Sequence, residues 1–259
     1  MLFSFFIGYE IVQNRKIHKG KITKIEKQAN DLYLISFFSE TIDNIEPGQF
    51  VSILCGTHTL RRPFSVYDFD KEAKTVSVYF KLKGDGTKYM SSLKIGDTID
   101  FIGAMGNCFS IYEEKNLIIG AGVGFAPVFY LAKKLKNAYK VAAFASEKDI
   151  PNTLDADMFI TDDGTKGKKG SILNYLDEII QEVKPKIIYS CGPMIVLKAV
   201  AQAGIKYNIK TEIAMEKIMA CSVGVCRGCV IKVKDENGNI QNKTVCKNGP
   251  VFAGGEVVW

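Results

Sequence analysis

The sequence is poor in proline, histidine and tryptophan and contains no long apolar run. Its 259 residues include 7 Pro, 2 His and 1 Trp. No apolar stretch approaches the roughly 20 residues that a membrane-spanning helix requires, so we expect no membrane span. The apolar residues 1–7 lack a preceding basic region and a small-residue cleavage site, so we expect no secretory signal either. Two interpretations of residues 1–7 stay open, a frayed extension and an edge strand.

The charge is too weak and too dispersed to indicate nucleic-acid binding. Lys and Arg number 34 and Asp and Glu 28, which gives a net charge of +6 spread over the whole length. This excess would suit anionic nucleotides or an acidic protein partner, and a solvated lysine-rich surface explains it equally well. Without repeats or low-complexity segments, the chain has the composition of a globular protein of one or two domains.

The sequence pattern divides the chain into three regions. From about Ile17 to Phe109, short β-branched and aromatic runs alternate with turn signals, which predicts an antiparallel β-barrel. From Asn116 onward, apolar strands alternate with helices, which predicts a parallel α/β sheet with right-handed crossovers. The last region is rich in Cys and Gly, with a hairpin expected over Val230–Val245. The expected domains are 1–110, 111–214 and 215–259.

Individual elements can be assigned within these regions. In the barrel region the expected strands include Leu32–Phe38, Gln49–Leu54, Phe64–Tyr67, Val76–Leu82 and Thr98–Ile102. In the sheet region the expected strands are Asn116–Ile119, Val141–Ala145, Met158–Thr161 and Ile187–Ser190, and the expected helices are Phe125–Asn137, Ser171–Glu182 and Met194–Ala203. Gly204 would end the last of these helices.

Four of the seven cysteines gather near the C-terminus. Cys221, Cys226 and Cys229 have the spacing C-x4-C-x2-C, and Cys246 follows after 16 intervening residues. This spacing is typical of the ligands of a plant-type [2Fe-2S] cluster. The small, glycine-containing loop between the first ligands can wrap closely around such a cluster. We therefore predict an iron–sulfur site on these four cysteines.

Other uses of these cysteines are less favoured. Structural zinc sites usually combine two C-x2-C pairs or mix Cys with His, whereas one such pair occurs here and both His18 and His58 lie far upstream. Disulfides or free thiols are the remaining alternative. In a chain without an expected export signal, clustered cysteines indicate metal ligands and a reducing cytoplasm. Cys55 and Cys108 show no ligand spacing, and we interpret both as structural.

Two short motifs in the barrel region favour a flavin. In Arg62–Ser65 the arginine could pair with a pyrophosphate, the Pro-Phe pair could form an apolar wall, and the serine could hydrogen-bond a flavin ring atom. Gly84–Thr87 precedes a short predicted helix, and N–H groups at a helix start bind phosphate. Alone, each motif also fits an ordinary strand start or hairpin turn. Their order within one barrel is the stronger signal.

Glycines after a predicted buried strand indicate a second nucleotide site. The turn Gly120–Gly124 precedes a helix, although Phe125 breaks the full G-x-G-x-x-G fingerprint. Cys191 ends another strand at the same carboxyl edge, where it could lie near a nicotinamide ring or serve as a small buried hydrophobe. Thr161–Gly164 ends a third strand and is more typical of a turn than of a nucleotide contact. The candidate nucleotide residues are Gly120, Gly122, Gly124, Cys191 and Gly192.

The barrel, its flavin motifs, the nucleotide sheet and the cysteine cluster, in this order, resemble the ferredoxin–NADP reductase superfamily with a C-terminal iron–sulfur extension. Within it, the chain resembles the electron-transfer subunits of dihydroorotate dehydrogenase B over nearly its whole length. The motifs that carry the resemblance are R-R-P-F-S at Arg61–Ser65, G-D-G-T at Gly84–Thr87, G-A-G-V-G at Gly120–Gly124, C-G-P at Cys191–Pro193, E-K-I-M-A-C-S-V-G-V-C-R-G-C at Glu216–Cys229 and C-K-N-G-P-V-F at Cys246–Phe252.

The resemblance implies specific cofactor contacts. The implied FAD contacts are Arg62, Pro63, Phe64, Ser65, Tyr79, Phe80, Lys81, Gly86 and Thr87, and the implied cluster ligands are Cys221, Cys226, Cys229 and Cys246. Two departures from the family pattern are visible. Gly103–Asn107 lacks the usual proline, and Lys81 stands where the family often has arginine, so a charge is kept without the planar guanidinium. We identify no general acid or base that the redox step requires.

The resemblance also implies a function and a partner. The chain would relay electrons from the FMN of a dihydroorotate-oxidising catalytic subunit through the [2Fe-2S] cluster and FAD to NAD⁺, in pyrimidine biosynthesis. Two copies of each subunit would form a heterotetramer. One alternative is a subunit of an NAD(P)H:ferredoxin or sulfide dehydrogenase, which would share every motif, and another is a zinc-stabilised binding module without a redox role. The sequence leaves the choice between NAD and NADP open.

Overall fold

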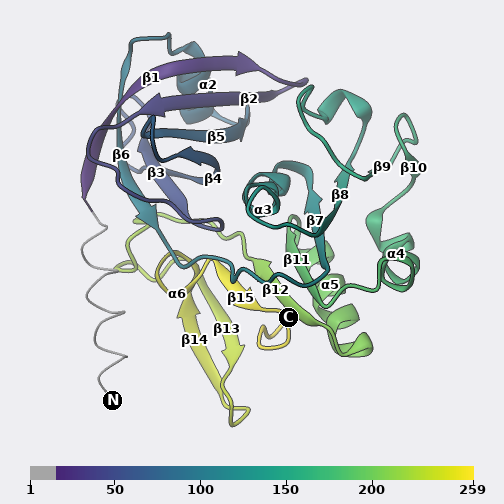
Figure 1. Cartoon of the computed structure of the whole chain (residues 1–259). Helices are drawn as coiled ribbons and strands as arrows, with labels where there is room; N and C mark the ends of the chain where they lie inside the picture. Colours follow the sequence, from purple (N-terminus) through teal and green to yellow (C-terminus); the bar gives the residue numbers. More distant parts are fainter. Residues whose placement is uncertain (1–15) are drawn as a thin grey trace.

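The computed structural model describes residues 16–259, so the apolar segment 1–7 lies outside the described residues. Within the described part, six antiparallel strands close into a barrel in the order β1-β2-β5-β4-β3-β6 (Figure 1). Their bounds are β1 Ile17–Lys27, β2 Leu32–Phe38, β3 Phe50–Leu54, β4 Arg62–Asp70, β5 Thr75–Lys81 and β6 Thr98–Met105, and helix α2 Asp85–Ser92 follows β5. The predicted barrel is confirmed, and β1 is a strand that the sequence pattern did not single out.

The strands of the barrel differ in how many of their faces are covered. Along the first half of β1, buried and exposed residues alternate, as expected where one face meets the core and the other meets solvent. In β3, by contrast, Phe50, Val51, Ser52 and Ile53 are all buried. Because successive side chains of a strand point to opposite faces, β3 must be covered outside the barrel as well. The C-terminal part of the chain provides this cover, since Ser52 donates a hydrogen bond to Ser222.

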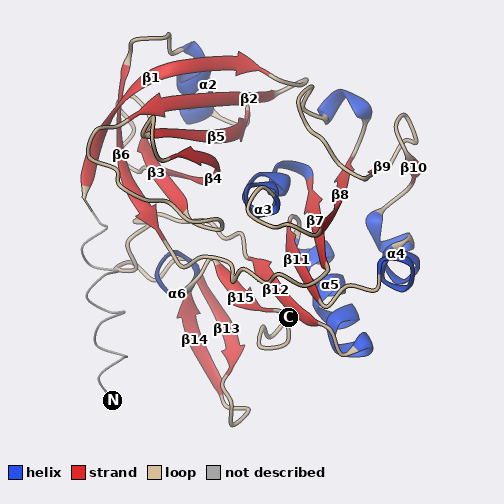
Figure 2. Ribbon diagram, viewed as in Figure 1, coloured by secondary structure: helices blue, strands red, loops and turns tan. Residues whose placement is uncertain are grey.

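The second part of the fold is a sheet with the strand order β10-β9-β8-β7-β11-β12-β15 (Figure 2). All neighbouring pairs are parallel except β12 with β15, which are antiparallel. The strands are β7 Asn116–Ala121, β8 Ala138–Phe144, β9 Met158–Thr161, β10 Lys168–Lys169, β11 Ile187–Cys191, β12 Lys210–Ala214 and β15 Val251–Ala253. The predicted α/β sheet is confirmed, with an antiparallel edge strand added by the end of the chain.

Helices cover both faces of this sheet. Helix α3 (Phe125–Ala132) packs with Ile118 of β7 on one face. Helices α4 (Leu176–Val183) and α5 (Met194–Tyr207) pack with Leu117 of the same strand on the other face. Adjacent residues of β7 pack against helices on opposite faces of the sheet. The strand is therefore buried on both faces and almost entirely apolar, as is typical of a parallel strand between two helical layers.

Three predicted helix boundaries are wrong. Helix α3 ends at Ala132 instead of Asn137, because the chain must turn back so that the Asn137 carbonyl can accept the N–H of Asn116 (2.9 Å) at the start of β7. The helix expected over Ser171–Glu182 is divided into a short 3₁₀ turn, Ile172–Asn174, and α4.

Gly204 does not end α5 as predicted but lies inside it. A Cβ atom at Gly204 would lie 2.0 Å from the Thr211 hydroxyl, so glycine is required there by the close packing of α5 on β12. The helix continues to Tyr207 and ends at Asn208, which has the left-handed φ of 51°.

The C-terminal region is small and contacts both larger units. Its hairpin consists of β13 (Val230–Lys234) and β14 (Ile240–Thr244), with Gly238 in the turn at φ 81°, as predicted for Asn237–Gly238. A short helix, α6 (Val245–Asn248), leads from the hairpin to β15. The barrel and the sheet also contact each other directly, since the buried Tyr130 hydroxyl of α3 donates to the Ile45 carbonyl at 2.9 Å. Among residues 16–259, no helix is long and apolar enough to cross a membrane.

Candidate functional site

Seven of the nine predicted flavin residues meet in one cavity between the barrel and the sheet, which we call the flavin cavity. Its volume is about 320 Å³, within the usual range of small-molecule pockets. Val123 and Ala126, which belong to the glycine turn Gly120–Gly124 and to α3, close one side of it. The predicted residues on its wall are Pro63, Phe64 and Ser65 from β4, Tyr79, Phe80 and Lys81 from β5, and Thr87 from α2.

The flavin cavity also has a wall that sequence reasoning missed. Phe50 of β3 and Lys83 belong to the barrel, while the other members come from near the C-terminus. The missed residues are Phe50, Lys83, Met215, Glu216, Lys217, Met219 and Pro250. One residue, Ala220, separates the segment Met215–Met219 from Cys221. The flavin cavity and the predicted cluster site are therefore joined by a few residues of one chain segment.

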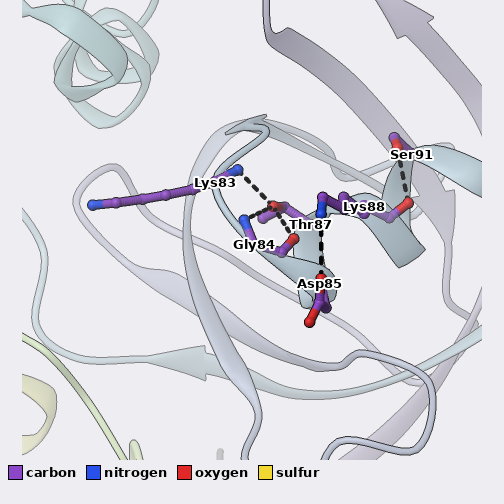
Figure 3. Close-up of polar contacts among 6 residues, drawn as sticks. All are labelled: Lys83, Gly84, Asp85, Thr87, Lys88 and Ser91. Atoms are coloured by element: carbon purple, nitrogen blue, oxygen red, sulfur yellow. Dashed lines mark hydrogen bonds and ion pairs between the residues drawn. The ribbon is translucent and has the colours of Figure 1, made fainter.

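Arg62 and Gly86 lie next to each other but do not line this cavity. A Cβ atom at Gly86 would lie 3.4 Å from Arg62 Nε, so the arginine from β4 and the start of α2 are close, as the two motifs predicted. The Thr87 hydroxyl accepts the N–H groups of Lys83 (2.9 Å) and Gly84 (3.2 Å) and donates to the Gly84 carbonyl (2.9 Å) (Figure 3). These bonds hold the turn that precedes α2, whose first N–H groups can receive an anion.

The charged residues around the flavin cavity are mostly cationic. Lys81 Nζ lies 3.4 Å from Asp149 Oδ1, across the gap between the barrel and the sheet. Lys83 and Lys217 form no ion pair within residues 16–259. Glu216 lines the cavity, and desolvation by the surrounding protein raises the pKa of its carboxyl above the ordinary value, although the charge of Lys83 offsets part of this rise. Apolar walls with nearby cations suit an aromatic ring that carries phosphate groups.

The two predicted parts of the nucleotide site are in direct contact. Cys191 of β11 and Gly120 of β7 are register partners in parallel strands. A Cβ atom at Gly124 would lie 2.6 Å from the Cys191 carbonyl oxygen, and one at Gly192 would lie 2.7 Å from Ala121 Cβ. Both segments thus share the carboxyl edge of the sheet, where open α/β sheets bind ligands.

A second cavity, of about 130 Å³, lies beside the glycine turn. Gly122, at φ 53°, and Val123 line it together with Lys81 and Asp149. The thiol of Cys191 is buried and lines neither this nor the flavin cavity, and burial raises its pKa well above the ordinary value. The backbone of Cys191 borders the glycine turn at Gly124.

The four clustered cysteines form two pairs. Cys229 and Cys246 have their sulfurs 3.3 Å apart. Cys226 approaches Cys221 with both its backbone N–H, at 3.4 Å from the sulfur, and its side chain. In the described part of the chain, no three His, Cys, Asp or Glu side chains gather around the position of one metal ion. Two pairs suit a [2Fe-2S] cluster, in which each iron takes two protein ligands, better than a zinc ion, which needs four ligands around one centre.

Backbone N–H groups are directed at the sulfurs. Those of Cys226, Gly228 and Cys246 lie 3.4 Å from the sulfurs of Cys221, Cys226 and Cys229, respectively. Burial raises the pKa of Cys221, but such backbone hydrogen bonds outweigh it and lower the pKa to about 6. A thiolate is the form that binds metal, so these backbone N–H groups favour the ligand form of Cys221.

Comparison with known proteins agrees with this geometry. Residues 216–258 match the family described as the iron-sulfur cluster binding domain of dihydroorotate dehydrogenase B. The chain is 38% identical to the dihydroorotate dehydrogenase B (NAD(+)) electron transfer subunit of Caldanaerobacter subterraneus subsp. tengcongensis, over 93% of this chain and 98% of the relative. It is 34% identical to the subunit of the same name from Listeria monocytogenes serotype 4b, over 92% and 97%. The chain belongs to the family of dihydroorotate dehydrogenase B electron transfer subunits.

Solved structures place this electron transfer subunit in a wider fold group. A chain of the NADH-dependent reduced ferredoxin-NADP oxidoreductase superimposes with a TM-score of 0.82 at 28% identity, over 93% of this chain and 90% of that one. The ferredoxin reductase of carbazole 1,9a-dioxygenase superimposes with a TM-score of 0.64 at 18% identity, over 75% and 66%. The second likeness concerns the fold alone. The predicted ferredoxin reductase-like architecture with an iron–sulfur extension is confirmed.

Proposed function

We propose that this chain is the electron transfer subunit of an NAD-dependent dihydroorotate dehydrogenase that acts in pyrimidine biosynthesis in the cytoplasm. The observation that carries the proposal is the continuity of the two cofactor sites. Met215, Glu216, Lys217 and Met219 line the cavity that holds most of the flavin motif residues, and the same segment leads into the first cysteine of the cluster motif. One chain segment thus borders both redox centres, as an electron relay requires.

The flavin cavity is proposed to hold the ring system of FAD, with the pyrophosphate toward Arg62, Gly86 and Thr87. FAD, when bound, exchanges two electrons with a nicotinamide and single electrons with an iron–sulfur cluster. The chain's own part is to bind and orient the cofactor. The proposed ring contacts are Pro63, Phe64, Ser65, Tyr79, Phe80 and Lys81.

NAD(H) is proposed to bind at the carboxyl edge of the sheet. Its phosphates would meet the glycine turn at Gly120, Gly122 and Gly124, beside the backbone of Cys191 and Gly192. Val123 lines both the second cavity and the flavin cavity. A nicotinamide bound beside the glycine turn can therefore reach the flavin cavity over a short path.

The cluster is assigned to Cys221, Cys226, Cys229 and Cys246, and the functional domains to residues 1–110, 111–214 and 215–259. The partner is proposed to be an FMN-containing catalytic subunit that oxidises dihydroorotate, with two copies of each subunit in the assembly. The curated relatives are named as electron transfer subunits, and a subunit of this kind operates with a catalytic partner.

Anaerobic purification followed by an absorbance spectrum and cofactor analysis tests the proposal. We expect about one FAD, two irons and two sulfides per chain, and reduction of both chromophores by NADH. Addition of the FMN-containing subunit should then produce dihydroorotate-dependent reduction of NAD⁺. A chain that holds flavin without iron would be a simple flavin reductase. A complete relay that reduces ferredoxin but never couples to the dihydroorotate-oxidising subunit would favour a ferredoxin-linked enzyme instead.

A further inference from the structure

Two barrel residues bind the segment that carries the cysteines, which we call the cluster segment (residues 215–250). Between Cys221 and Cys229 this segment has no helix or strand. Its internal hydrogen bonds there run from backbone N–H groups to the sulfurs. A loop of this kind does not fix its own position relative to the barrel, so contacts from outside must do so.

The first contact is made directly beside the first ligand. The Ser52 hydroxyl of β3 donates to the Ser222 hydroxyl at 3.0 Å, and the two residues are 0% and 1% exposed. Ser222, the residue after Cys221, has the left-handed φ of 59°, which is uncommon for serine. Ser52 is also the register partner of Pro63, which lines the flavin cavity. A single hydrogen bond thus joins the strand next to the flavin wall to the loop of the first cysteine.

The second contact lies beyond the last ligand. The Asn107 side chain accepts the N–H of Val251 (2.9 Å) and donates to the Val251 carbonyl (2.8 Å), so it pairs with that residue as a neighbouring strand would. The Asn107 N–H also donates to the Gly249 carbonyl at 2.8 Å. Asn107 follows β6 of the barrel, and Val251 lies shortly after Cys246. The cluster segment is therefore bound by the barrel at both ends of its set of cysteines.

We infer that Ser52 and Asn107 are positioning residues that fix the distance and orientation of the iron–sulfur cluster relative to the flavin, an inference that rests on the function proposed above. Neither side chain lines the flavin cavity, and neither belongs to the cysteine set. They act through the loop, and the step that depends on them is the electron exchange between flavin and cluster. Hydride exchange between nicotinamide and flavin uses other parts of the chain.

The test compares Ser52→Ala with a matched control in the holoprotein. Ser36 of β2 forms a similar serine–serine hydrogen bond to Ser77 of β5 (2.7 Å) in the same barrel, and neither strand adjoins β3, so Ser36→Ala is the control. Stopped-flow mixing with NADH separates flavin reduction from cluster reduction. For Ser52→Ala we expect the rate of flavin reduction to be unchanged. The rate of cluster reduction should fall by about two- to tenfold, which corresponds to the loss of one buried hydrogen bond. The EPR signal of the reduced cluster should be broader. Ser36→Ala should match the wild type in all three.

Ser222→Ala removes the other hydroxyl of the Ser52–Ser222 hydrogen bond, at a position outside the barrel. This variant keeps the test decisive if Ser52→Ala does not fold. The two single variants and the double variant should show the same slowing, because they remove one interaction. Asn107→Ala should slow the same step. Asn107→Asp keeps the acceptor for the Val251 N–H, so it should recover part of the lost rate.

If Ser52→Ala and Ser222→Ala hold their cluster and reduce it at the wild-type rate, the positioning inference is overturned while the proposed function stands. A wild-type protein without a cluster would overturn the proposed function as well.

Discussion

Gly124 lies so close to Cys191 that no side chain fits between them: a Cβ atom at Gly124 would lie 2.6 Å from the Cys191 carbonyl oxygen. The backbone at Gly124 is right-handed helical, with φ −62°, so alanine is excluded by space and not by backbone conformation. Gly124→Ala should separate the glycine turn from the Cys191 loop. We expect a free energy of unfolding lower by about 1–3 kcal/mol, as for overpacked cores, together with a raised KM for NADH and unchanged FAD content.

Gly255→Ala provides the control for this prediction, because nothing lies within 4 Å of a Cβ atom at Gly255. Denaturant unfolding and steady-state NADH oxidation check both variants. A Gly124→Ala protein with wild-type stability and wild-type KM would show that the two loops need not be in contact.

Removal of the Thr87 hydroxyl should weaken the phosphate end of the flavin site. This hydroxyl makes three hydrogen bonds in the turn before α2. For Thr87→Ala we expect a loss of about 1 kcal/mol in stability, similar to the loss of a helix cap, and a higher Kd for FAD. Ser91→Ala is the control, since its hydroxyl donates to the Lys88 carbonyl within the same helix (2.8 Å) (Figure 3). FAD titration by fluorescence quenching distinguishes them, and equal affinity in the two variants would contradict the assignment.

Cys226→Ala should remove the cluster and leave the flavin. Cys226 is an exposed member of the first cysteine pair, so its loss disturbs little of the core. We expect iron content close to zero, loss of the iron–sulfur absorbance, and flavin reduction by NADH at the wild-type rate. Cys108→Ser, at another exposed cysteine, should keep its full iron content. Full iron in Cys226→Ala would remove this cysteine from the ligand set.

The stability of the barrel should depend on the ionised form of Asp100. Burial raises the pKa of this carboxyl, but Lys19 and Arg61 outweigh burial and hold the pKa below its ordinary value. A carboxyl whose pKa is lowered in the folded state contributes stability above its unfolded pKa of about 3.9, and this contribution is lost as the pH falls through the folded pKa.

We therefore expect Asp100→Asn to lower the free energy of unfolding at pH 7 by about 1.5–3 kcal/mol, the value of a hydrogen bond to a charged group. The difference from the wild type should shrink as the pH approaches about 3. Glu113→Gln removes an ion pair in which both side chains are 84% exposed, and it should change little at any pH. Thermal unfolding over a pH series measures both. A pH-independent difference for Asp100→Asn would assign the effect to packing.

The sequence predicted those parts of the site that lie within continuous motifs. The order of the barrel motifs was sufficient to predict that β4, β5 and the start of α2 meet, because short loops bring successive strands together. The cysteine spacing predicted a set of four ligands, and the structure brings these cysteines together as two pairs. The contribution of Met215, Glu216 and Pro250 to the flavin cavity could not be predicted, since it depends on how the C-terminal segment packs against the outer face of β3.

Errors in the element boundaries have a similar cause. Glycine is common just after the C-terminal end of a helix, so the sequence favoured a stop at Gly204, but the close contact of Gly204 with Thr211 of β12 is a tertiary requirement. The orientation of Arg62 is another such case. Its guanidinium donates to the Leu60 carbonyl at 2.7 Å and lies next to Gly86, and Arg62 does not line the cavity. The local sequence motif identified Arg62 as a candidate, but the direction of its side chain depends on tertiary packing.

The cluster segment leaves the sheet at Ala214 and returns to it at Val251, and these two residues are register partners in the antiparallel strands β12 and β15. Neighbouring strands lie about 4.8 Å apart, so the two junctions are as close as those of a tight hairpin. The segment is an insertion between two adjacent strands, and a two-residue turn could connect these strands without changing the strand order of the sheet. A chain without this segment would keep every strand connection of the nucleotide sheet, but its flavin cavity would lose the wall that Met215, Glu216, Lys217, Met219 and Pro250 provide.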